Sequence, residues 1–460
     1  MDPPDTEVQV ANCADAAAAA AISCAARELF EETGVLIAGG SDTLTKGQRA
    51  SLLDDLESGR MTWPALLRHY SLSLNARDFT FAGRWLTPPF SAKRFDTWFF
   101  LAHCPPKQEP RVTGDAELES GEWISARQAH GRWERSEILA VPPTLHALKT
   151  LADGIGPDLL ERLLSIPQAH RQPVRRIEFR PNYICFPVRT PTKPPATHTN
   201  CYLIYTSSEI LIIDPGSPFE DEQAALAVCL DELMGEGRTI REIVLTHKHP
   251  DHVEGVNALL NHFKQMGRQP SPPVAAHRYT AEDLSDHVPV NRWIEDEEVI
   301  ELAGTPAISL RAMHTPGHAR GHLCFYEERT GTLISGDNVV GLGSVLIDPP
   351  EGNMGDYLNS LQRMRELPNL SVMFGGHGPA IANPYTKIDE YITHRLEREA
   401  NILSAVRNGA AIPSQIVAQV YIDVSPKAHA MAGRAVLAHL EKLEADGLVK
   451  RDPEGNYETL

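Results

Sequence analysis

Histidine and aspartate side chains are concentrated in four short segments of this sequence, at spacings that suit a metal site. The densest segment is THKHPDH at residues 246–252, which holds three imidazoles and one carboxylate within six residues. Imidazole nitrogens and carboxylate oxygens are ligands of zinc, and one tetrahedral zinc accepts only about four of them. Any further ligands would therefore indicate a second metal ion beside the first.

Three later segments supply such ligands. They are HTPGHARGH at residues 314–322, LISGD at residues 333–337 and FGGHGP at residues 374–379. Glycine residues beside a ligand allow the backbone to approach a metal closely, because glycine has no Cβ atom. The four segments together predict a pair of adjacent metal ions.

The residues around the densest segment predict the elements that position it. Residues 243–245 form a short apolar and β-branched run, which is typical of a buried strand. Side chains two residues apart on a strand point to the same side, so His247 and His249 can face one metal. Pro250 ends the strand, and a helix is expected near residues 255–263.

These four segments resemble the metallo-β-lactamase superfamily, in its HxHxDH branch, over about residues 175–400. The resemblance implies an α+β fold, an αββα sandwich with two Zn²⁺ ions at one edge between its sheets; Mn²⁺ and Fe²⁺ are the alternative metals. It further implies the individual ligands. One zinc would be held by His247, His249 and His318, the second by Asp251, His252 and His377, with Asp337 bridging the two. His314 and His322 flank the same motif and are expected to play supporting, structural roles.

The implied chemistry is hydrolysis of an ester, thioester or phosphodiester by a metal-bound hydroxide. A metal pair lowers the pKa of bound water toward neutrality and stabilises negative charge on the substrate. Asp251 is the predicted catalytic residue, because its carboxylate can orient the hydroxide. No cysteine falls at a ligand position, so the pattern resembles the thioesterase and nuclease relatives more than the antibiotic hydrolases.

The C-terminal residues predict a separate small domain, at residues 410–460, after a metal domain at 175–405. Residues 412–420, 428–445 and 447–457 have the patterns of a helix, a second helix and a hairpin. With the preceding stretch that matches YIxHRxxRE, they resemble the winged-helix tail of the β-lactamase-like protein 2 group. Members of that group are associated with cleavage of single-stranded RNA, so an endoribonuclease is the alternative function.

Three side chains of that stretch are candidate contacts to an anionic substrate: His394, Arg395 and Arg398. Glu397 and Glu399 lie among them, so a solvated helix with internal ion pairs is an equal alternative. A role for the tail in packing or in forming an oligomer is a further alternative.

The N-terminal residues 27–35, RELFEETGV, match the second half of the Nudix box, REUxEExGU. Glu28, Glu31 and Glu32 share one helix face there and could gather Mg²⁺, provided that the domain is active. With predicted strands at residues 94–102 and 122–124, the region resembles the coenzyme A diphosphatase-like branch of the Nudix family, an α/β fold. The first half of the box is missing, so residues 1–155 are expected to form an incomplete domain.

The chain has 460 residues and a net charge of −18, which argues against general adhesion to nucleic acid or to anionic membranes. No apolar run approaches the roughly 18 residues that span a bilayer. The seven cysteines include no CxxC pair, which favours reduced thiols and a cytoplasmic protein. The sequence therefore predicts a metal-dependent hydrolase of a small acyl ester or thioester or of single-stranded RNA, with no membrane partner. A non-catalytic binding or regulatory protein is the rival class.

Overall fold

The computed structural model describes residues 8–460 except residues 89, 92, 112–120, 172, 269 and 423–424. The chain divides into two compact units. The first consists of residues 1–87, 94–132 and 143–174, and the second of residues 88–93, 133–142 and 175–460. Each unit has a hydrophobic core of its own.

The first unit is mainly helical and contains two small pairs of strands. Its long helix α1 begins where the Asp15 side chain accepts hydrogen bonds from the N–H groups of Ala17 and Ala18, and it ends at Gly34, which has a φ of 69°. β1 pairs with β2 in parallel, and β3 pairs with β4 antiparallel. The principal elements are β1 (Val10–Ala11), α1 (Ala16–Thr33), α2 (Lys46–Glu57), α3 (Trp63–His69), β2 (Leu74–Asn75), β3 (Thr80–Leu86), β4 (Asp96–Leu101), α4 (Ala126–Glu134), α5 (Pro142–Ala152) and α6 (Leu159–Leu163).

One of the two strands predicted for this region is confirmed and the other is wrong. Residues 94–102 contain β4, which pairs with β3 along its whole length. Residues 122–124 form no strand; they lead directly into α4. A β-branched or aromatic run becomes a strand only where a partner strand accepts its backbone hydrogen bonds, and the sequence does not reveal that partner.

The second unit is built on two mixed sheets. Seven strands form one sheet, in the order β11, β10, β9, β8, β7, β6, β5, and five form the other, in the order β12 to β16. The strands of the larger sheet are β5 (Ile177–Arg180), β6 (Tyr183–Arg189), β7 (His198–Tyr205), β8 (Glu209–Ile213), β9 (Thr239–Val244), β10 (Val274–Ala276) and β11 (Arg292–Trp293). Those of the smaller sheet are β12 (Val299–Leu302), β13 (Ile308–His314), β14 (Leu323–Glu327), β15 (Thr332–Gly336) and β16 (Val372–Gly375).

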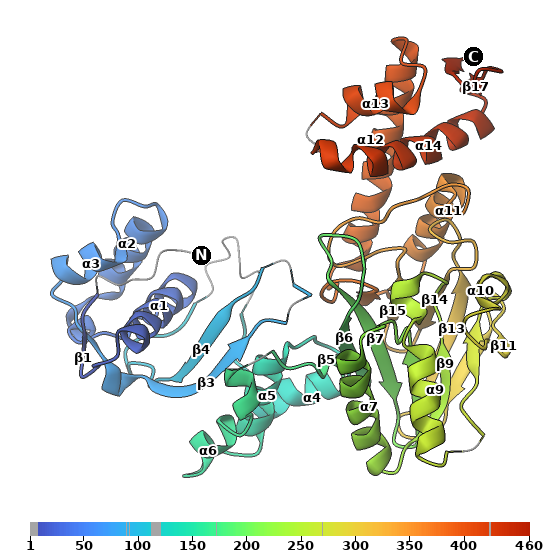
Figure 1. Cartoon of the computed structure of the whole chain (residues 1–460). Helices are drawn as coiled ribbons and strands as arrows, with labels where there is room; N and C mark the ends of the chain where they lie inside the picture. Colours follow the sequence, from blue (N-terminus) through green and yellow to red (C-terminus); the bar gives the residue numbers. More distant parts are fainter. Residues whose placement is uncertain are drawn as a thin grey trace. The chain divides into compact units, whose positions relative to one another are not determined.

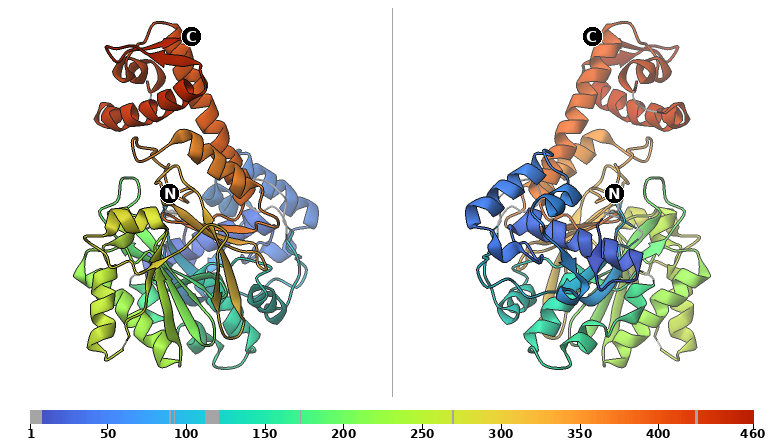
Figure 2. Two further views of the ribbon diagram at one scale, coloured as in Figure 1. Left: turned by 90° about the vertical axis from the view of Figure 1, so that its right-hand side faces the viewer. Right: turned by 90° about the vertical axis from the view of Figure 1, so that its left-hand side faces the viewer.

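The two sheets lie face to face with helices on their outer sides (Figures 1 and 2). One buried cluster joins the inner faces, with Tyr202 of the larger sheet against Phe374 of the smaller sheet. The outer face of the larger sheet packs against α7 and α9, and that of the smaller sheet against α11 and α12. These layers agree with the sandwich predicted from the sequence. The helices are α7 (Glu220–Gly235), α8 (Pro250–Val253), α9 (Val256–Gln265), α10 (Arg278–Leu284), α11 (Met354–Arg365) and α12 (Pro384–Arg407).

The long helix α12 continues from the two-sheet part of this unit into the C-terminal domain (Figure 2). That domain comprises α13 (Pro413–Val420), α14 (His429–Ala445), β17 (Val449–Arg451) and β18 (Tyr457–Thr459), with β17 and β18 antiparallel. The predicted order of helix, helix and hairpin is confirmed. Ile402 of α12 belongs to the same buried cluster as Val436 and Leu440 of α14, so α12 is part of both cores. In the described part of the chain, no helix combines the length and apolarity needed to cross a membrane.

Candidate metal centre and active site

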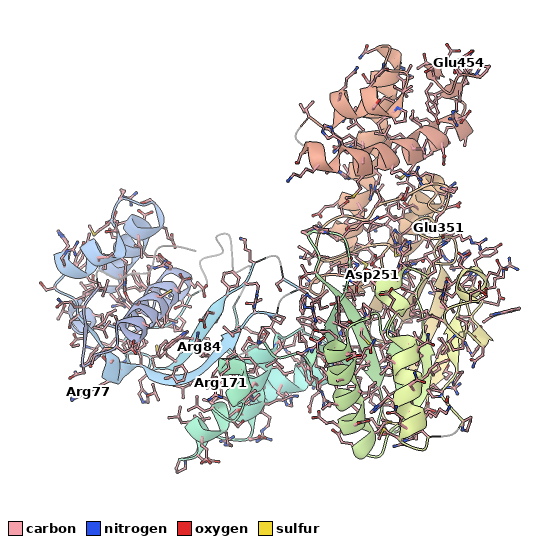
Figure 3. All side chains as sticks on the ribbon, viewed as in Figure 1. Arg77, Arg84, Arg171, Asp251, Glu351 and Glu454 are labelled. Atoms are coloured by element: carbon pink, nitrogen blue, oxygen red, sulfur yellow. The ribbon has the colours of Figure 1, made fainter. Side chains whose placement is uncertain are left out.

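The four histidine- and aspartate-bearing segments all lie at the ends of strands. Residues 246–252 follow β9 of the larger sheet, and the other three segments contain the ends of β13, β15 and β16 of the smaller sheet and the residues just after them. β15 and β16 are buried throughout, and β9 is buried over its last three residues, next to the histidine segment. Figure 3 labels Asp251, one of the converging side chains, in this unit.

Three imidazoles form the first group. The ligand atoms of His247, His249 and His318 lie within 4.8 Å of one another. His249 Nδ1 is 2.9 Å from His247 Nε2 and 3.0 Å from His318 Nε2. His249 itself precedes α8, whose first residue is Pro250, and so lies where the chain turns from strand to helix.

The hydrogen bonds on the far side of these rings determine which nitrogens carry protons. His318 donates from Nδ1 to the Leu346 carbonyl at 2.9 Å, because a carbonyl can only accept. The Thr246 hydroxyl donates to Asp214 at 2.6 Å, so it accepts from His247 Nδ1 at 3.0 Å. The Nε2 atoms of both histidines therefore present lone pairs to the third ring, whose single N–H can satisfy only one of them. A shared cation would satisfy all three nitrogens.

A second group adjoins the first and consists of Asp251, His252 and His377, again with ligand atoms within 4.8 Å. His252 donates from Nδ1 to Asp214 Oδ2 at 2.8 Å, and His377 donates from Nδ1 to the His198 carbonyl at 2.8 Å. Each ring is thereby oriented with its Nε2 toward the group, as is usual for metal-ligating histidines. His377 Nε2 lies 3.5 Å from Asp251 Oδ2.

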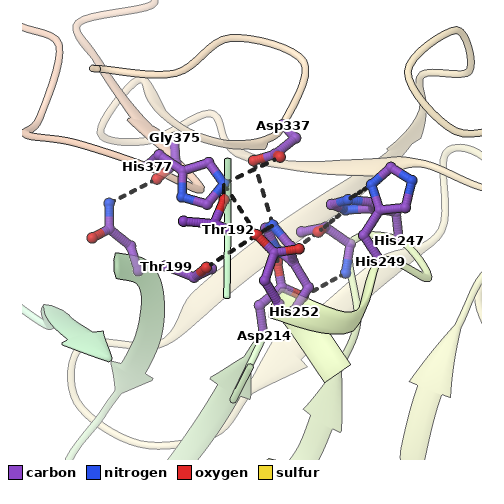
Figure 4. Close-up of polar contacts among 12 residues, drawn as sticks. Thr192, Thr199, Asp214, His247, His249, His252, Asp337, Gly375 and His377 are labelled. Atoms are coloured by element: carbon purple, nitrogen blue, oxygen red, sulfur yellow. Dashed lines mark hydrogen bonds and ion pairs between the residues drawn. The ribbon is translucent and has the colours of Figure 1, made fainter. Parts of the chain in front are cut away.

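Asp337 lies between the two groups (Figure 4). Its Oδ2 is 3.8 Å from His318 Nε2 in the first group and 3.3 Å from His377 Nε2 in the second. Its Oδ1 is 3.5 Å from His252 Nε2. A carboxylate in this place can contact cations on both sides.

The charge states of the first group and of Asp337 suit metal ligation, whereas, against the opposing effect of burial, the nearby Asp337 carboxylate raises the pKa of His252 and of His377. Burial lowers the pKa of His247 well below its ordinary value, lowers that of His249 to about 3, and lowers that of His318. These rings are therefore neutral and offer lone pairs. Burial alone would raise the pKa of Asp337, but the nearby His377 and His252 outweigh it and hold that pKa well below its usual value.

The unsatisfied atoms of the cluster point to the same conclusion. His252 Nε2 and Asp337 Oδ1 are buried and have no hydrogen-bond partner within the described residues. A buried polar atom without a partner is destabilising, whereas two divalent cations would satisfy it and neutralise the carboxylates. The donor set and its geometry thus fit metal ions.

Two glycines beside the ligands make room for this convergence. A Cβ atom on Gly376 would lie 2.3 Å from Asp337 Oδ1, and one on Gly317 would lie 2.3 Å from the Cα atom of Tyr357. Gly317 also has a φ of 130°, which other residues rarely adopt. Gly376 therefore lies directly against a candidate ligand carboxylate, and Gly317 lies against α11. Close approach of the backbone to a metal stays a prediction.

Comparisons with known proteins agree with this geometry. Residues 194–377 match the metallo-beta-lactamase superfamily, and residues 413–456 match the beta-lactamase associated winged helix domain. The chain is 31% identical over 254 residues to the Caenorhabditis elegans beta-lactamase-like protein 2 homolog, covering 55% of this chain and 80% of that protein. The chain belongs to the metallo-beta-lactamase superfamily.

Other relatives add the reaction class. An atrochrysone carboxyl ACP thioesterase of Passalora fulva is 29% identical over 265 residues, covering 55% of this chain and 72% of that protein. A beta-lactamase domain protein from Burkholderia ambifaria shares the fold, with a TM-score of 0.54, 21% identity, and coverage of 64% of this chain and 96% of that one. The chain is a metal-dependent hydrolase of the metallo-β-lactamase superfamily, with a C-terminal winged-helix domain.

Asp214 is a site residue that the sequence analysis did not identify. It follows β8, is 2% exposed, and accepts hydrogen bonds from the Thr246 hydroxyl and backbone N–H and from His252 Nδ1. One carboxylate therefore supports a histidine of each metal group, through Thr246 to His247 and directly to His252. The signal was present, because an apolar strand that ends in Asp and is followed by Pro-Gly resembles the strand that ends at Asp337.

The two flanking histidines occupy supporting positions. His322 is fully buried, and its Nε2 accepts a hydrogen bond from the backbone N–H of Asp337 at 3.1 Å. His314 stacks on His277, with ring centroids 4.0 Å apart, and bonds through Nε2 to the Arg320 carbonyl. His322 thus orients the carboxylate segment from behind.

The three predicted substrate contacts on α12 do not converge on the metal cluster. Arg395 is 6% exposed and donates to the Val345 carbonyl, and Arg398 donates to the Val420 carbonyl at 2.7 Å. His394 is exposed. Each of the two arginines uses part of its guanidinium group to bind a backbone carbonyl. Substrate contact by His394, Arg395 and Arg398 stays a prediction.

The predicted Nudix cluster has a different arrangement from the metal centre. Arg27 donates to Glu28 Oε1 at 2.6 Å and to Glu31 Oε2 at 2.7 Å, so a guanidinium occupies the helix face expected to gather Mg²⁺. The groups of metal-ligating side chains found among the described residues do not include Glu28, Glu31 or Glu32. The Mg²⁺ site and the Nudix domain stay predictions.

A cavity of 360 Å³ opens beside the metal cluster. Asp251, His318 and Asp337 form part of its wall, and the remaining wall is mostly apolar. Lys193 is the one lysine or arginine among the described residues that line it. The lining residues are Pro191, Thr192, Lys193, Pro194, Pro195, Ala196, His249, Pro250, Asp251, His318, Asp337, Val340, Leu342, Gly343, Ser344, Val345, Leu346, His377 and Met431.

Proposed function

We propose that this hydrolase binds two Zn²⁺ ions and hydrolyses an acyl thioester in the cavity beside them. The apolar wall next to the metal cluster is the observation that carries the substrate class. The first zinc would be held by His247, His249 and His318, the second by Asp251, His252 and His377, with Asp337 between them.

The donor types support zinc. The set contains imidazole nitrogens and carboxylate oxygens only, which suit zinc and, as alternatives, Mn²⁺ and Fe²⁺. When bound, two such ions supply Lewis acidity and lower the pKa of water toward neutrality. The chain's own residues provide orientation: Asp214, the Leu346 carbonyl and the His198 carbonyl each fix one ligand ring.

Asp251 is the proposed catalytic residue. Its carboxylate lines the cavity, and the Thr199 hydroxyl donates to its Oδ2 at 3.4 Å. In the reaction, Asp251 accepts a proton from the attacking water, whose oxygen bonds to the thioester carbonyl carbon. The carbon–sulfur bond then breaks, and the thiol leaves with that proton while the acid product remains.

The walls of the cavity support an acyl substrate. Apolar side chains line much of the cavity beside the metal cluster, among them Pro194, Pro195, Val345, Leu346 and Met431. Such a wall favours an alkyl or aryl group and excludes bulk water, whereas a phosphodiester backbone requires several cationic contacts. A relative named as an acyl-carrier-protein thioesterase supports the same choice.

The alternative of RNA cleavage has less support from the tail. Three arginines of the C-terminal helices are engaged within the chain, because Arg395 and Arg398 bind backbone carbonyls and Arg434 pairs with Asp348. Arg407 and Arg451 are exposed, so the support against RNA cleavage comes from the first three alone. A winged helix that grips nucleic acid is expected to direct such groups outward.

The test is a substrate panel with the zinc-loaded full chain. Acyl thioesters with alkyl chains of graded length and labelled single-stranded RNA would be incubated under the same conditions, and zinc would be counted by elemental analysis. We expect about two metal ions per chain and turnover of thioesters. Cleavage of RNA without thioester turnover would overturn the substrate class, and a metal-free chain would favour a non-catalytic binding protein.

A further inference from the structure

One wall of the active-site cavity comes from the winged-helix domain. Met431 lies on α14 and lines the same cavity as Asp251 and His377. Met431 is 40% exposed. A methionine side chain is apolar and unbranched, and it adapts to ligands of different shape.

The neighbouring wall is a segment that we call the cavity loop, residues 342–348. Its residues 342–346 all line the cavity. The Leu346 carbonyl accepts the hydrogen bond from His318 Nδ1 that orients this ring of the first metal group. The conformation of the loop therefore affects both the cavity and one ligand.

Two arginines of the C-terminal helices bind the cavity loop. Arg395 of α12 donates through Nη2 to the Val345 carbonyl, and its guanidinium lies 5.3 Å from the ring centre of Tyr357. Arg434 of α14 donates through Nε to Asp348 Oδ1. These contacts hold the loop one residue before and two residues after the Leu346 carbonyl.

We propose that the winged-helix domain is a working part of the active site, in which Met431 determines the acyl-chain specificity and Arg395 and Arg434 position the cavity loop. This inference rests on the proposed thioesterase function. Met431 borders the space that receives the acyl group, and the two arginines keep the loop closed against that group. In this proposal the tail acts through the apolar contact of Met431 and through the positioning of the cavity loop by Arg395 and Arg434.

The first experiment changes the volume of the side chain at position 431 in the cavity wall. Met431→Ala and Met431→Trp would be assayed against acyl thioesters of graded chain length, with kcat and KM measured separately. The alanine variant enlarges the cavity, so the preferred chain becomes longer, and the tryptophan variant makes it shorter. One methylene in an apolar pocket changes kcat/KM by about tenfold or more, which sets the expected size of the shift.

A binding measurement provides a readout independent of turnover. Non-hydrolysable alkyl thioethers of the same chain lengths would be titrated into each zinc-loaded variant by calorimetry, and the optimum length should shift in parallel. Met266→Ala is the matched control, because Met266 is 45% exposed and does not line the cavity. Its profile should equal that of the unaltered protein.

The second experiment releases the cavity loop. Arg434→Met removes the ion pair with Asp348. Arg434→Lys keeps a positive charge at this position and should preserve part of that ion pair. We expect faster amide hydrogen exchange in residues 342–348 and a broadened chain-length profile in Arg434→Met, both partly restored in Arg434→Lys. The control is Arg365→Met, which breaks the comparably exposed pair with Asp389 away from the loop.

The outcomes separate this inference from the proposed function. If the unaltered chain hydrolyses thioesters but the Met431 and Arg434 variants keep its chain-length profile, the inference is wrong and the proposed function stands. If the unaltered chain neither hydrolyses thioesters nor binds the thioethers, both are wrong. A loss of zinc in the Met431 variants would show a structural role instead and would also overturn the inference.

Discussion

The metal cluster and the glutamate face of α1 both group acidic or ligating side chains, but only the cluster brings its ligand atoms together. His247, His318 and His377 come from separate strand ends, and each ring is fixed from behind by a hydroxyl or carbonyl. Glu28 and Glu31 share one helix, and Arg27 of the same helix binds both.

The difference has a physical cause. Helical spacing can place carboxylates on one face, but a nearby arginine satisfies them without any metal. Convergence from four strand ends buries the ligands and leaves His252 Nε2 and Asp337 Oδ1 without hydrogen-bond partners. The two regions therefore differ less in the types of their side chains than in what orients them. In the metal cluster, other residues hold the rings of His247, His318 and His377 in place, whereas on α1 the glutamates pair with an arginine.

Replacing Asp251 is expected to have the largest effect. Asp251→Ala removes the carboxylate that accepts the proton of the attacking water and that is also a proposed ligand of the second zinc, so kcat/KM for thioesters should fall by about 10³-fold or more. Glu31→Gln, the counterpart in the first unit, should leave that rate unchanged. Stopped-flow release of the thiol measures both, and equal activity of Asp251→Ala would remove this residue from the mechanism.

Removal of the metal tests whether the two regions respond differently. A metal at a concentration of 100 times its Kd stabilises the folded state by about 2.7 kcal/mol, provided that it binds only the folded chain. Chelation should therefore speed amide exchange in residues 246–252 and 333–337 and leave residues 22–34 unaltered. If chelation speeds amide exchange equally in the metal cluster and in residues 22–34, the effect does not arise from metal bound at the cluster.

Asp214→Asn tests whether the hydrogen bonds that orient the histidine ligands contribute to zinc binding. Asp214 orients His252 directly and His247 through Thr246, so its loss should weaken zinc binding by about 10–100-fold. Competition with a fluorescent chelator would measure the affinity. Asp231→Asn, which removes a carboxylate paired with His262 away from the cluster, is the control and should retain the original affinity.

Glu31→Gln should have the smallest effect. Its pair with Arg27 spans one helical turn, so the free energy of unfolding should fall by only about 0.3–0.5 kcal/mol. Urea denaturation followed by circular dichroism measures this change. Loss of Mg²⁺ binding or of coenzyme A turnover in this variant would instead support the predicted Nudix site.

Part of the functional site was predictable from the sequence because its ligands lie in short motifs next to buried strands. The apolar run at residues 243–245 predicted a buried strand that leads into residues 246–252. The strand ends at Val244, earlier than predicted, so His247 and His249 lie in the turn that follows it and strand alternation does not place them. The helix, helix and hairpin of the tail were equally visible, because local hydrophobic periodicity determines them.

Other features depend on contacts between residues distant in sequence. The sequence around Asp214 shows a carboxylate at the end of an apolar strand, but its bonds to Thr246 and His252 depend on the placement of β8 beside β9. Arg395 belongs to a stretch that suggested substrate contact, yet it is buried and holds the cavity loop.

The amino-acid sequence by itself determined the ligand types, the strand ends that carry them and the elements of the tail, because these depend on side-chain chemistry and local spacing. Only the tertiary structure decided which ring nitrogens are free to bind a cation, which carboxylate supports them and which domain completes the cavity wall. Those properties arise from hydrogen bonds and packing between elements far apart in the chain.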